Sequence, residues 1–196
     1  VIVLTHFFGF SVLVNIAWAC AVALACEALA LALRRRPVAF YLKDCSALVT
    51  ASLLAIALPP CSPWWLIGVG IGCAILLSKH LYGGLGYNPF NPAMVGYVIL
   101  LISFPLQMTA WTPPRGLGEL PGIVDALQAC FWPARFDGTT MATPLDIMRQ
   151  NNSLLLADLY ARTPQFGRWA GLGWEWVNLA FLAGGAWLLY RRIFSW

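Results

Sequence analysis

Charge is scarce in this sequence. Asp, Glu, Lys and Arg make up 10% of its 196 residues, whereas a soluble domain carries about 25%. A surface with so few charges cannot be hydrated on all sides, which argues against a soluble enzyme. The net charge is only +4, and nucleic acid is not an expected partner.

Metal-binding patterns are also missing. None of the six cysteines forms a C-x-x-C pair, and most lie in apolar stretches, where cysteine behaves as a small hydrophobe. His6 and His80 stand apart from other ligand-type residues. We therefore expect no zinc, iron–sulfur or other metal site within this chain, and no catalytic set of side chains. The cysteines are Cys20, Cys26, Cys45, Cys61, Cys73 and Cys130.

The first residues lack the features of a secretory signal. They contain no charged n-region and no A-x-A cleavage pattern. The chain starts at Val1 inside an apolar run and ends at Trp196 just after a basic helix end. We expect that a longer protein continues beyond both positions.

Long apolar runs dominate what is present. Hydrophobic residues make up 60% of the chain, and its mean hydropathy is +0.73. A helix needs about 20 mostly apolar residues to cross a bilayer core. The sequence therefore predicts an all-α, multi-pass transmembrane protein, whose second span is short and has Asp44 as its N-cap. The five expected spans are 12–33, 45–58, 63–78, 93–111 and 173–190.

Basic residues flank these spans on one side. The long segment 112–170 lies on the other side and holds five of the chain's eight acidic residues. Short basic flanks lie in the cytoplasm, so we expect 112–170 to be a periplasmic loop of a bacterial inner-membrane protein. The helices then occupy 1–111 and 171–196. The basic flanks are Arg34, Arg35, Arg36, Lys43, Lys79, Arg191 and Arg192.

Aromatic residues flank the same spans. Belts of Trp and Tyr are expected at both membrane interfaces and need no ligand to explain them. The expected outer belt is Trp64, Trp65, Trp111, Trp174 and Trp176, and the inner belt is Tyr82, Tyr190 and Trp196.

The stretch "GGLGYNPFNPA", residues 83–93, interrupts two apolar spans with three glycines, two prolines and two asparagines. Proline disfavours helix before it, and irregular backbone at membrane depth survives only in protein or beside a cavity. The stretch favours a re-entrant or broken element, with Asn88 and Asn91 as candidates for an ion cavity. An ordinary cytoplasmic turn with an Asn cap is the alternative.

Glu27 lies within the first expected span. An ionisable side chain inside a membrane is a functional candidate by default, so Glu27 joins the candidate ion-cavity residues. It lies about two helical turns before Arg34, near the cytoplasmic interface, where a structural role fits equally well.

The segment "DGTTMATPLD", residues 137–146, is polar in a mostly apolar chain. Pro144 suits the first position of a helix, which makes Thr143 the N-cap. Helix starts favour phosphate, so the Thr143 hydroxyl could bind or be esterified to one, although a plain helix cap is the simpler interpretation. Two helical pieces are expected in this loop, at 122–131 and 143–160.

Three stretches together resemble the NqrB/RnfD family, which contains membrane subunits of the sodium-pumping NADH:quinone reductase and of the Rnf electron-transport complex. The first is "KDCSALVTASLLAIALPPCSPWW", residues 43–65. The second is "KHLYGGLGYNPFNPAMVGYVILLISFPLQMTAW", residues 79–111. The third is "DGTTMATPLD" with "GLGWEWVNLAFLAGGAWLL", residues 171–189.

This resemblance implies that a flavin transferase attaches FMN to the Thr143 hydroxyl as a phosphoester. The family motif carries over onto Asp137, Gly138, Thr140, Ala142 and Thr143, whereas Met141 replaces the commonest Gly. Side chains near the motif are candidates for contacting the flavin ring or its phosphate. They are Trp132, Phe136 and Arg149.

The resemblance also implies a fold and a role. The fold would be transporter-like, with two five-helix repeats, of which this chain would contain the first and its long outer loop. The role would be electron transfer between ferredoxin and NAD coupled to Na⁺ or H⁺ transport. Expected partners are the periplasmic flavin subunit and the membrane iron–sulfur subunits of the Rnf complex, and riboflavin is a second candidate cofactor.

Two other functions remain open from the residues alone. One is a small-solute channel or transporter without a redox cofactor, since a broken element at 83–93 suits it as well. The other is a purely structural membrane subunit. The 137–143 motif discriminates against both, because neither needs a flavin-attachment site.

Overall fold

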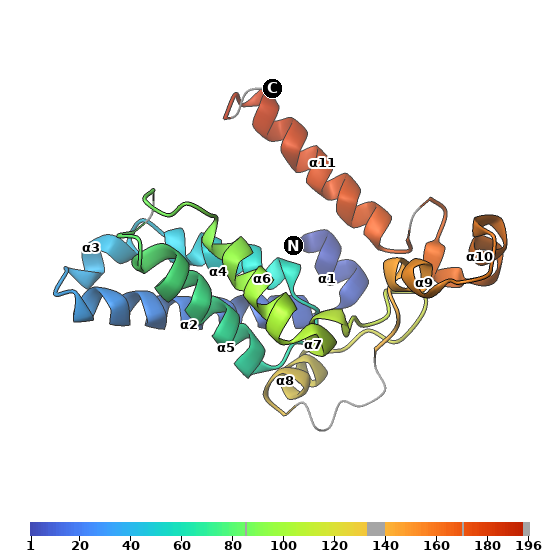
Figure 1. Cartoon of the computed structure of the whole chain (residues 1–196), viewed down its shortest axis with the longest axis horizontal. Coiled ribbons are helices and arrows are strands. Elements are labelled where there is room, and N and C mark those ends of the chain that lie inside the picture. Colours follow the sequence, from blue (N-terminus) through green and yellow to red (C-terminus); the bar gives the residue numbers. More distant parts are fainter. Residues whose placement is uncertain (85, 133–139, 170, 194–196) are drawn as a thin grey trace.

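The fold is helical throughout the part of the chain that is described. A computed structural model covers residues 1–196, and all are described except 85, 133–139, 170 and 194–196 (Figure 1). Apart from one isolated bridge, Arg115 with Gly118, these residues form helices, turns and irregular segments. The all-α prediction is confirmed.

The N-terminal helices include the longest one in the described chain. They are α1 (Ile2–Phe8), α2 (Ser11–Leu33), α3 (Val38–Leu42), α4 (Ser46–Ala57), α5 (Trp64–Gly72), the π-helix η1 (Cys73–His80), α6 (Pro92–Ser103) and α7 (Pro105–Thr109). The later helices are α8 (Ile123–Phe131), α9 (Pro144–Gln150), α10 (Leu156–Arg162), the 3-10 turn η3 (Pro164–Phe166) and α11 (Trp174–Tyr190).

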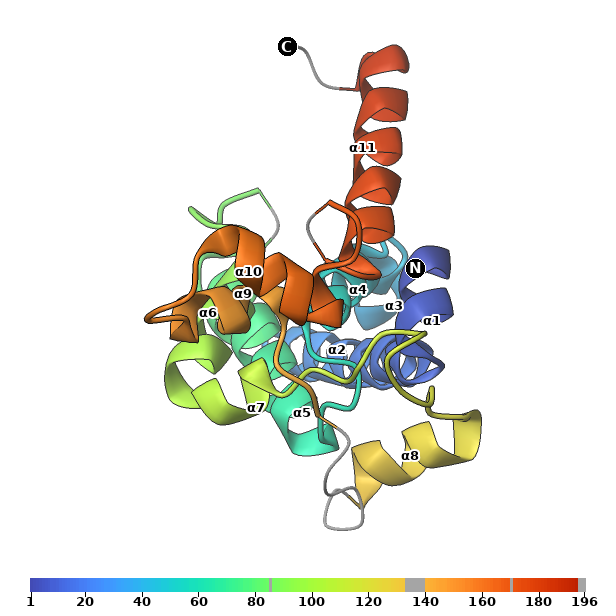
Figure 2. The same cartoon turned by 90° about the vertical axis from the view of Figure 1, so that its right-hand side faces the viewer.

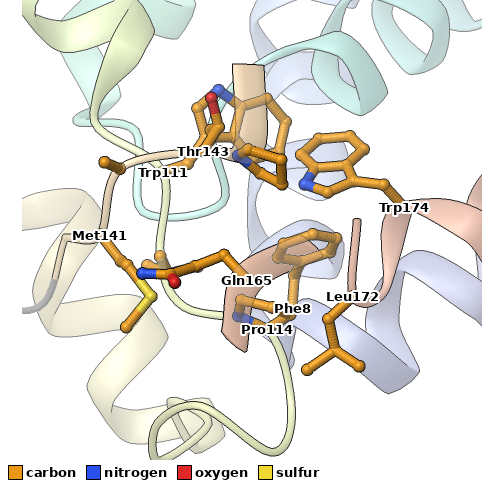
Figure 3. A pocket seen from close by; sticks show the side chains of 11 residues that line it. Phe8, Trp111, Pro114, Met141, Thr143, Gln165, Leu172 and Trp174 are labelled. Atoms are coloured by element: carbon orange, nitrogen blue, oxygen red, sulfur yellow. The ribbon is translucent and has the colours of Figure 1, made fainter. Parts of the chain in front are cut away.

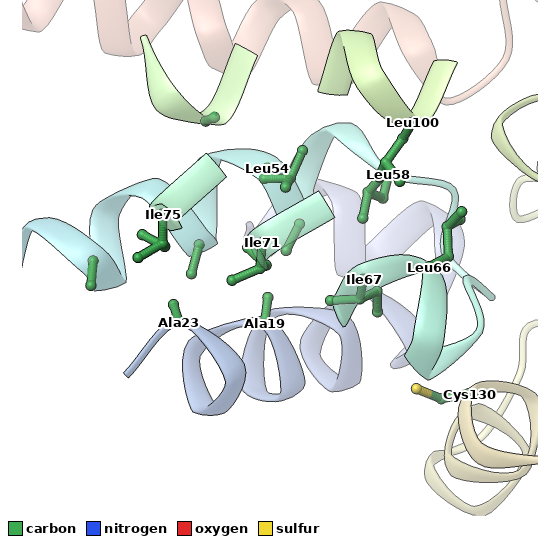
Figure 4. Close-up of a cluster of buried hydrophobic side chains, with 14 of the residues drawn as sticks. Ala19, Ala23, Leu54, Leu58, Leu66, Ile67, Ile71, Ile75, Leu100 and Cys130 are labelled. Carbon is green, nitrogen blue, oxygen red and sulfur yellow. The ribbon is translucent and has the colours of Figure 1, made fainter. Parts of the chain in front are cut away.

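A bundle of α2, α4, α5 and α6 forms the core. The small side chains Ala19 and Ala23 of α2 let the neighbouring helices approach closely, and they face Ile71 of α5 (Figure 4). Leu54 of α4 and Leu100 of α6 close the same cluster. Small residues at helix–helix interfaces are what apolar helices use to pack where lipid removes the hydrophobic drive.

Two glycines let α5 and α6 approach closely. A β-carbon added to Gly96 of α6 would lie 2.6 Å from the carbonyl oxygen of Gly70 in α5. A β-carbon on Gly70 would in turn meet Leu100 Cδ1 at 2.5 Å. At Gly96 the neighbour is backbone, so a larger residue would move the helices apart, whereas at Gly70 the neighbour is the end of the Leu100 side chain, which can shift.

One described helix, α2, is long and apolar enough to cross a membrane by itself. It coincides with the first expected span. Three shorter apolar helical segments follow at Ser46–Ala57, Trp64–His80 and Pro92–Ser103. The remaining four crossings, and the arrangement of five helices as one repeat, stay predictions.

Two expected spans differ in detail. The predicted helix over 93–111 ends at Ser103, because Pro105 offers no N–H and Phe104 adopts φ −133° and ψ 56°. The predicted helix over 63–78 extends to His80, and its second half widens into a π-helix. Such widened turns are rare in proteins as a whole, but those that occur are often found at functional sites.

The long loop contains separate helical pieces. The helix expected at 122–131 is present as α8. The single helix expected over 143–160 is wrong, since it is interrupted between α9 and α10. Asn151 causes the break: its side chain accepts a hydrogen bond from the Leu154 N–H at 3.0 Å and donates one to the Leu154 carbonyl at 2.8 Å. Asparagine competes with helical bonding in this way.

The two ends of the bundle carry different elements. Figure 1 shows α3 and the end of α2 at one side of the molecule and α9 and α10 at the other. Helix α11 leaves the bundle near α9 and projects away from it (Figures 1 and 2). All of α11 is described, and Val177 is its one buried residue. The basic segment 34–36 and the loop that carries Thr143 therefore lie at opposite ends.

Candidate functional site

The Thr143 hydroxyl lies at the start of α9, as the sequence predicted. Its Oγ1 donates a hydrogen bond to Asp146 Oδ2 at 2.6 Å and accepts one from the Asp146 N–H at 3.2 Å. The Thr143 N–H donates to the same carboxylate at 3.2 Å. This is a capping box with Pro144 at the first helical position. It holds the hydroxyl in one orientation.

Contacts on two sides hold the segment 141–144 against the bundle. The Met141 N–H donates to the Trp111 carbonyl at 2.8 Å. On the other side, a β-carbon on Gly171 would lie 2.9 Å from Pro144 Cγ. The segment before α11 therefore packs directly on the start of α9, and Thr143 is half-buried between the two.

An aromatic cluster lies beside the hydroxyl. Trp111 and Trp174 meet edge to face with ring centroids 4.7 Å apart, and Phe8 packs on both rings (Figure 3). The three rings come from α1, the segment just after α7 and the start of α11. They form one wall next to Thr143 and Pro144.

A wide apolar groove opens from this wall. It lies between the bundle, α9 and α11 and is open to solvent on one side. Thr143 and Pro144 form its rim, and aromatic and aliphatic side chains line it. These side chains include Tyr97, Trp111, Met148, Trp174 and Phe181. The arrangement suits a flat, largely apolar ring held by a polar tail.

Two buried polar atoms near Thr143 lack partners. Thr112 Oγ1 and Gln165 Oε1 have no hydrogen-bond partner among the residues that the structure describes. Both residues line the small void that Thr143 also touches. Buried polar groups are nearly always hydrogen-bonded, so a water molecule or a polar ligand group is expected at this position.

The other expected motif residues are only partly placed. Thr140 and Ala142 are exposed and line a second hollow, on the other side of α9, with Arg149 and Asp146. Trp132 ends α8 and is exposed, away from the hollows that contain Thr143. Asp137, Gly138 and Phe136 lie outside the described residues.

The two asparagines of 83–93 make local bonds. Asn91 caps α6 by accepting from the Ala93 N–H at 3.0 Å. Asn88 accepts from the Gly86 N–H and donates to the Phe90 carbonyl at 2.7 Å, in an exposed turn. This geometry matches the alternative of a turn with an Asn cap. A cavity role for these residues stays a prediction.

Glu27 contacts two ionisable side chains, and the sequence did not reveal these contacts. It is buried in the bundle, where it contacts Lys79 and His80 of η1. From the sequence alone, Lys79 is interpreted as a basic flank and His80 as an isolated residue. The spacing of 52 residues between Glu27 and Lys79 gives no local signal for this contact.

The aromatic wall was also missed as a site. The sequence predicts an interface belt for Trp111 and Trp174 and gives no sign of a role for Phe8. Their spacing along the chain carries no sign that the rings meet beside Thr143. The one signal in the sequence is that two belt tryptophans lie just before and just after the loop at 112–170.

The features together define an all-helical protein with a membrane-length apolar helix and an oriented threonine hydroxyl beside an aromatic groove. The chain belongs to the NQR2, RnfD, RnfE family, which it matches over residues 1–196. The resemblance seen in the sequence is confirmed.

Curated relatives agree with this assignment. They are named as the D component of an ion-translocating oxidoreductase complex. The relatives from Pseudomonas paraeruginosa and Cellvibrio japonicus are 56% and 53% identical, each over 98% of this chain and 56% of the relative. The relative from Vibrio atlanticus is 48% identical over 98% of this chain and 59% of its own length. The chain thus spans little more than half of these proteins.

Thiol labelling tests the predicted orientation. Cys45 is exposed near the basic end of the bundle, and Thr140 is exposed at the other end. We expect a membrane-impermeant maleimide to label Cys45 only in inverted vesicles. In a Cys45→Ser background, Thr140→Cys should be labelled from the periplasmic side. The opposite pattern would reverse the topology.

Cys130 serves as an internal control for that experiment. It is buried in α8, and this burial, together with the nearby Cys61, raises its pKa to about 11. The thiol therefore stays protonated at neutral pH and should react about a hundredfold more slowly than an ordinary thiol. Fast labelling of Cys130 in native membranes would show that α8 does not pack as described.

Proposed function

We propose that this chain is part of a membrane subunit of an ion-translocating oxidoreductase complex and carries electrons on an FMN attached to Thr143. The observation that carries the proposal is the oriented Thr143 hydroxyl at the rim of an aromatic groove, within the segment that resembles the flavin-attachment motif. The names of the relatives supply the kind of complex.

The residues present fit such a cofactor. Bound FMN would supply reversible electron uptake and release. Trp111, Trp174 and Tyr97 offer flat apolar faces in the groove, and stacking on aromatic rings is favourable. Thr112 Oγ1 and Gln165 Oε1 offer polar atoms without partners in the described structure in the adjoining small void. The groove would therefore hold the ring and orient it.

Asp146 prepares the hydroxyl for attachment. Attachment forms a bond between Thr143 Oγ1 and phosphorus, breaks the Oγ1–H bond and releases the leaving group of an activated flavin phosphate. Asp146 Oδ2 already accepts the Oγ1–H bond at 2.6 Å. It is therefore the atom placed to receive the released proton, as a general base does.

Asp146→Asn tests this role. An asparagine oxygen still accepts the Thr143 N–H and O–H bonds, but it cannot hold the released proton. We expect attachment by the transferase to slow about a hundredfold, measured as the growth of in-gel flavin fluorescence. Asp158→Asn, a carboxylate of α10 in the same loop, is the matched control. A wild-type rate in Asp146→Asn would show that Asp146 only caps the helix.

The decisive experiment for the proposed function is flavin fluorescence of the denatured full-length protein, with wild type beside Thr143→Ala. A channel or a purely structural subunit would carry no covalent flavin. Riboflavin, which would be lost on denaturation, is detected separately in an extract of the purified complex. Coupling to ferredoxin, NAD and a particular ion belongs to the same proposal.

A further inference from the structure

A buried ionic cluster lies in the bundle at the end opposite Thr143. Glu27 of α2 is 3% exposed, and Lys79 and His80 of η1 are 2% and 7% exposed. Lys79 Nζ donates to Glu27 Oε1 at 2.9 Å. His80 Nε2 lies 3.1 Å from the other carboxylate oxygen, Oε2. Apolar side chains at these three positions would pack in the bundle without burying any ionisable group.

Such a cluster is costly to bury. A charged group that leaves water loses hydration free energy. Only a well-aligned ion pair with further hydrogen bonds compensates for this loss, and a protein with apolar residues in place of the pair is often as stable. Ionisable residues within apolar helices are therefore candidates for ion or proton pathways. The π-helical turn of η1 makes the cluster possible, because two consecutive residues, Lys79 and His80, both reach Glu27.

The contact between Glu27 and His80 is favoured by a proton. Both Glu27 Oε2 and His80 Nε2 are buried, and neither has an aligned hydrogen-bond partner within the described residues. Without a proton, a carboxylate oxygen and an imidazole nitrogen are both acceptors, and they would repel each other at 3.1 Å. A proton on either atom would replace this repulsion by attraction, and the separation of 3.1 Å is short enough for the two groups to exchange one.

A chain of hydrogen bonds links this pair to the surface. Lys79 Nζ donates to Ser46 Oγ at 2.7 Å, and Ser46 Oγ donates to Asp44 Oδ1 at 2.6 Å. Ser46 is buried at the start of α4, whereas Asp44 is exposed. The chain thus runs from Glu27 through two polar groups to water at the basic end of the bundle.

Asp44 is suited to the outer end of this chain. Partial burial raises the pKa of its carboxyl, but the two hydrogen bonds from Ser46 and the charge of Lys79 outweigh this effect and lower the pKa below its ordinary value. At neutral pH the group is an ionised acceptor. It also accepts the Ser46 N–H at 2.8 Å, which keeps it aligned with the hydroxyl.

A hollow that is open to solvent adjoins the cluster, and Glu27, Lys79 and His80 are among its lining residues. It lies between η1, α3 and the turn that follows His80. The Arg34 guanidinium fixes the edge of this hollow by donating to the His80 carbonyl at 2.6 Å. Besides Glu27, Asp44, Lys79 and His80, the ionisable groups that face it are Arg36, Tyr41, Tyr82 and Tyr87.

We propose that Glu27 and His80 share an exchangeable proton, and that Lys79, Ser46 and Asp44 conduct it to and from the water at the basic end of the bundle. In the orientation observed, Lys79 passes an N–H proton to Ser46, which passes its O–H proton to Asp44, and Lys79 regains one from the Glu27–His80 pair. Rotation of the Ser46 hydroxyl reverses the direction. Each step breaks and forms one bond to hydrogen.

The ligand of this site is a proton and not a metal cation. The Lys79 ammonium occupies Glu27 Oε1, the oxygen that a cation would need, and His80 faces the second oxygen. This inference rests on the proposed function and deepens it, because it assigns the ion that electron transfer would move.

The experiment uses the full complex in proteoliposomes, with electron transfer started by its reduced donor and proton movement followed with a trapped pH dye. We expect Glu27→Gln and Ser46→Ala to slow proton movement about a hundredfold. Ser46→Thr keeps the hydroxyl and should restore it. Ser52→Ala, on the same helix but with its hydroxyl against Cys20, should behave as wild type.

Each outcome has a distinct meaning. Wild-type proton movement in Ser46→Ala and Glu27→Gln would reduce the cluster to a structural ion pair. Loss of ²²Na⁺ uptake with normal proton movement would also overturn the proposal. If Glu27→Gln fails to assemble, the comparison of Ser46→Ala with Ser46→Thr decides. The covalent flavin band should persist in all variants, and its absence from wild type would instead refute the proposed function.

Discussion

Replacing Thr143 by Ala should remove all covalently bound flavin from this protein and stop electron transfer through its complex. The substitution deletes the atom to which the flavin phosphate would be joined, Oγ1, and leaves the aromatic groove intact. The effect should therefore be complete rather than graded. In-gel fluorescence of the denatured protein measures the attachment, and donor-to-acceptor electron transfer in membranes measures the consequence.

Two variants control this result. Thr143→Ser keeps a hydroxyl at the same place and should retain part or all of the fluorescence. Thr163→Ala removes a hydroxyl of the same loop that lies outside the attachment motif and should keep the band. A fluorescent band in Thr143→Ala would place the flavin elsewhere. Full electron transfer without the band would refute the carrier role of Thr143.

Replacing Gly96 by Leu should leave little folded protein. Its β-carbon alone would lie 2.6 Å from the Gly70 carbonyl oxygen, which is closer than atoms can approach, so α5 and α6 would have to separate. The smaller change Gly96→Ala should lower the free energy of unfolding by about 1–3 kcal/mol, as overpacked cores do. Thermal unfolding of the detergent-purified protein measures both effects.

Gly68 provides the matched control. It lies in α5 as Gly70 does, but an added β-carbon there meets no atom within 4 Å in the described structure. Gly68→Ala should therefore keep the unfolding temperature of wild type or raise it slightly, since alanine favours helix. Equal stability of Gly96→Ala and Gly68→Ala would contradict the close contact of α5 with α6.

Several features could be predicted because they depend on neighbours in the sequence. Apolar composition predicts helices, and the start of α9 follows from Pro144 next to Thr143. Asn91 before Pro92 predicts the cap of α6 in the same way. The length of α2 is determined by an uninterrupted apolar run and a basic end at Arg34. In each case the deciding interaction spans about one helical turn.

The predicted helices over 93–111 and 143–160 are wrong in their extent because two local signals compete in each segment. Pro105 lies within an apolar run long enough for a span, and its missing N–H ends α6 although hydropathy continues. Asn151 lies in a helical pattern, but its side chain bonds to Leu154 and starts a new turn. Apolar periodicity alone does not reveal which signal prevails, because the balance depends on how each segment packs.

The sequence by itself determined the helical class, the family and the threonine at which attachment is proposed. Only the tertiary structure decided that Trp111 and Trp174 form a wall beside that threonine, and that Glu27 meets Lys79 and His80. The physical reason is that local bonding and hydropathy are properties of neighbouring residues. Contacts between residues 52 positions apart, as for Glu27 and Lys79, exist only once the helices have packed.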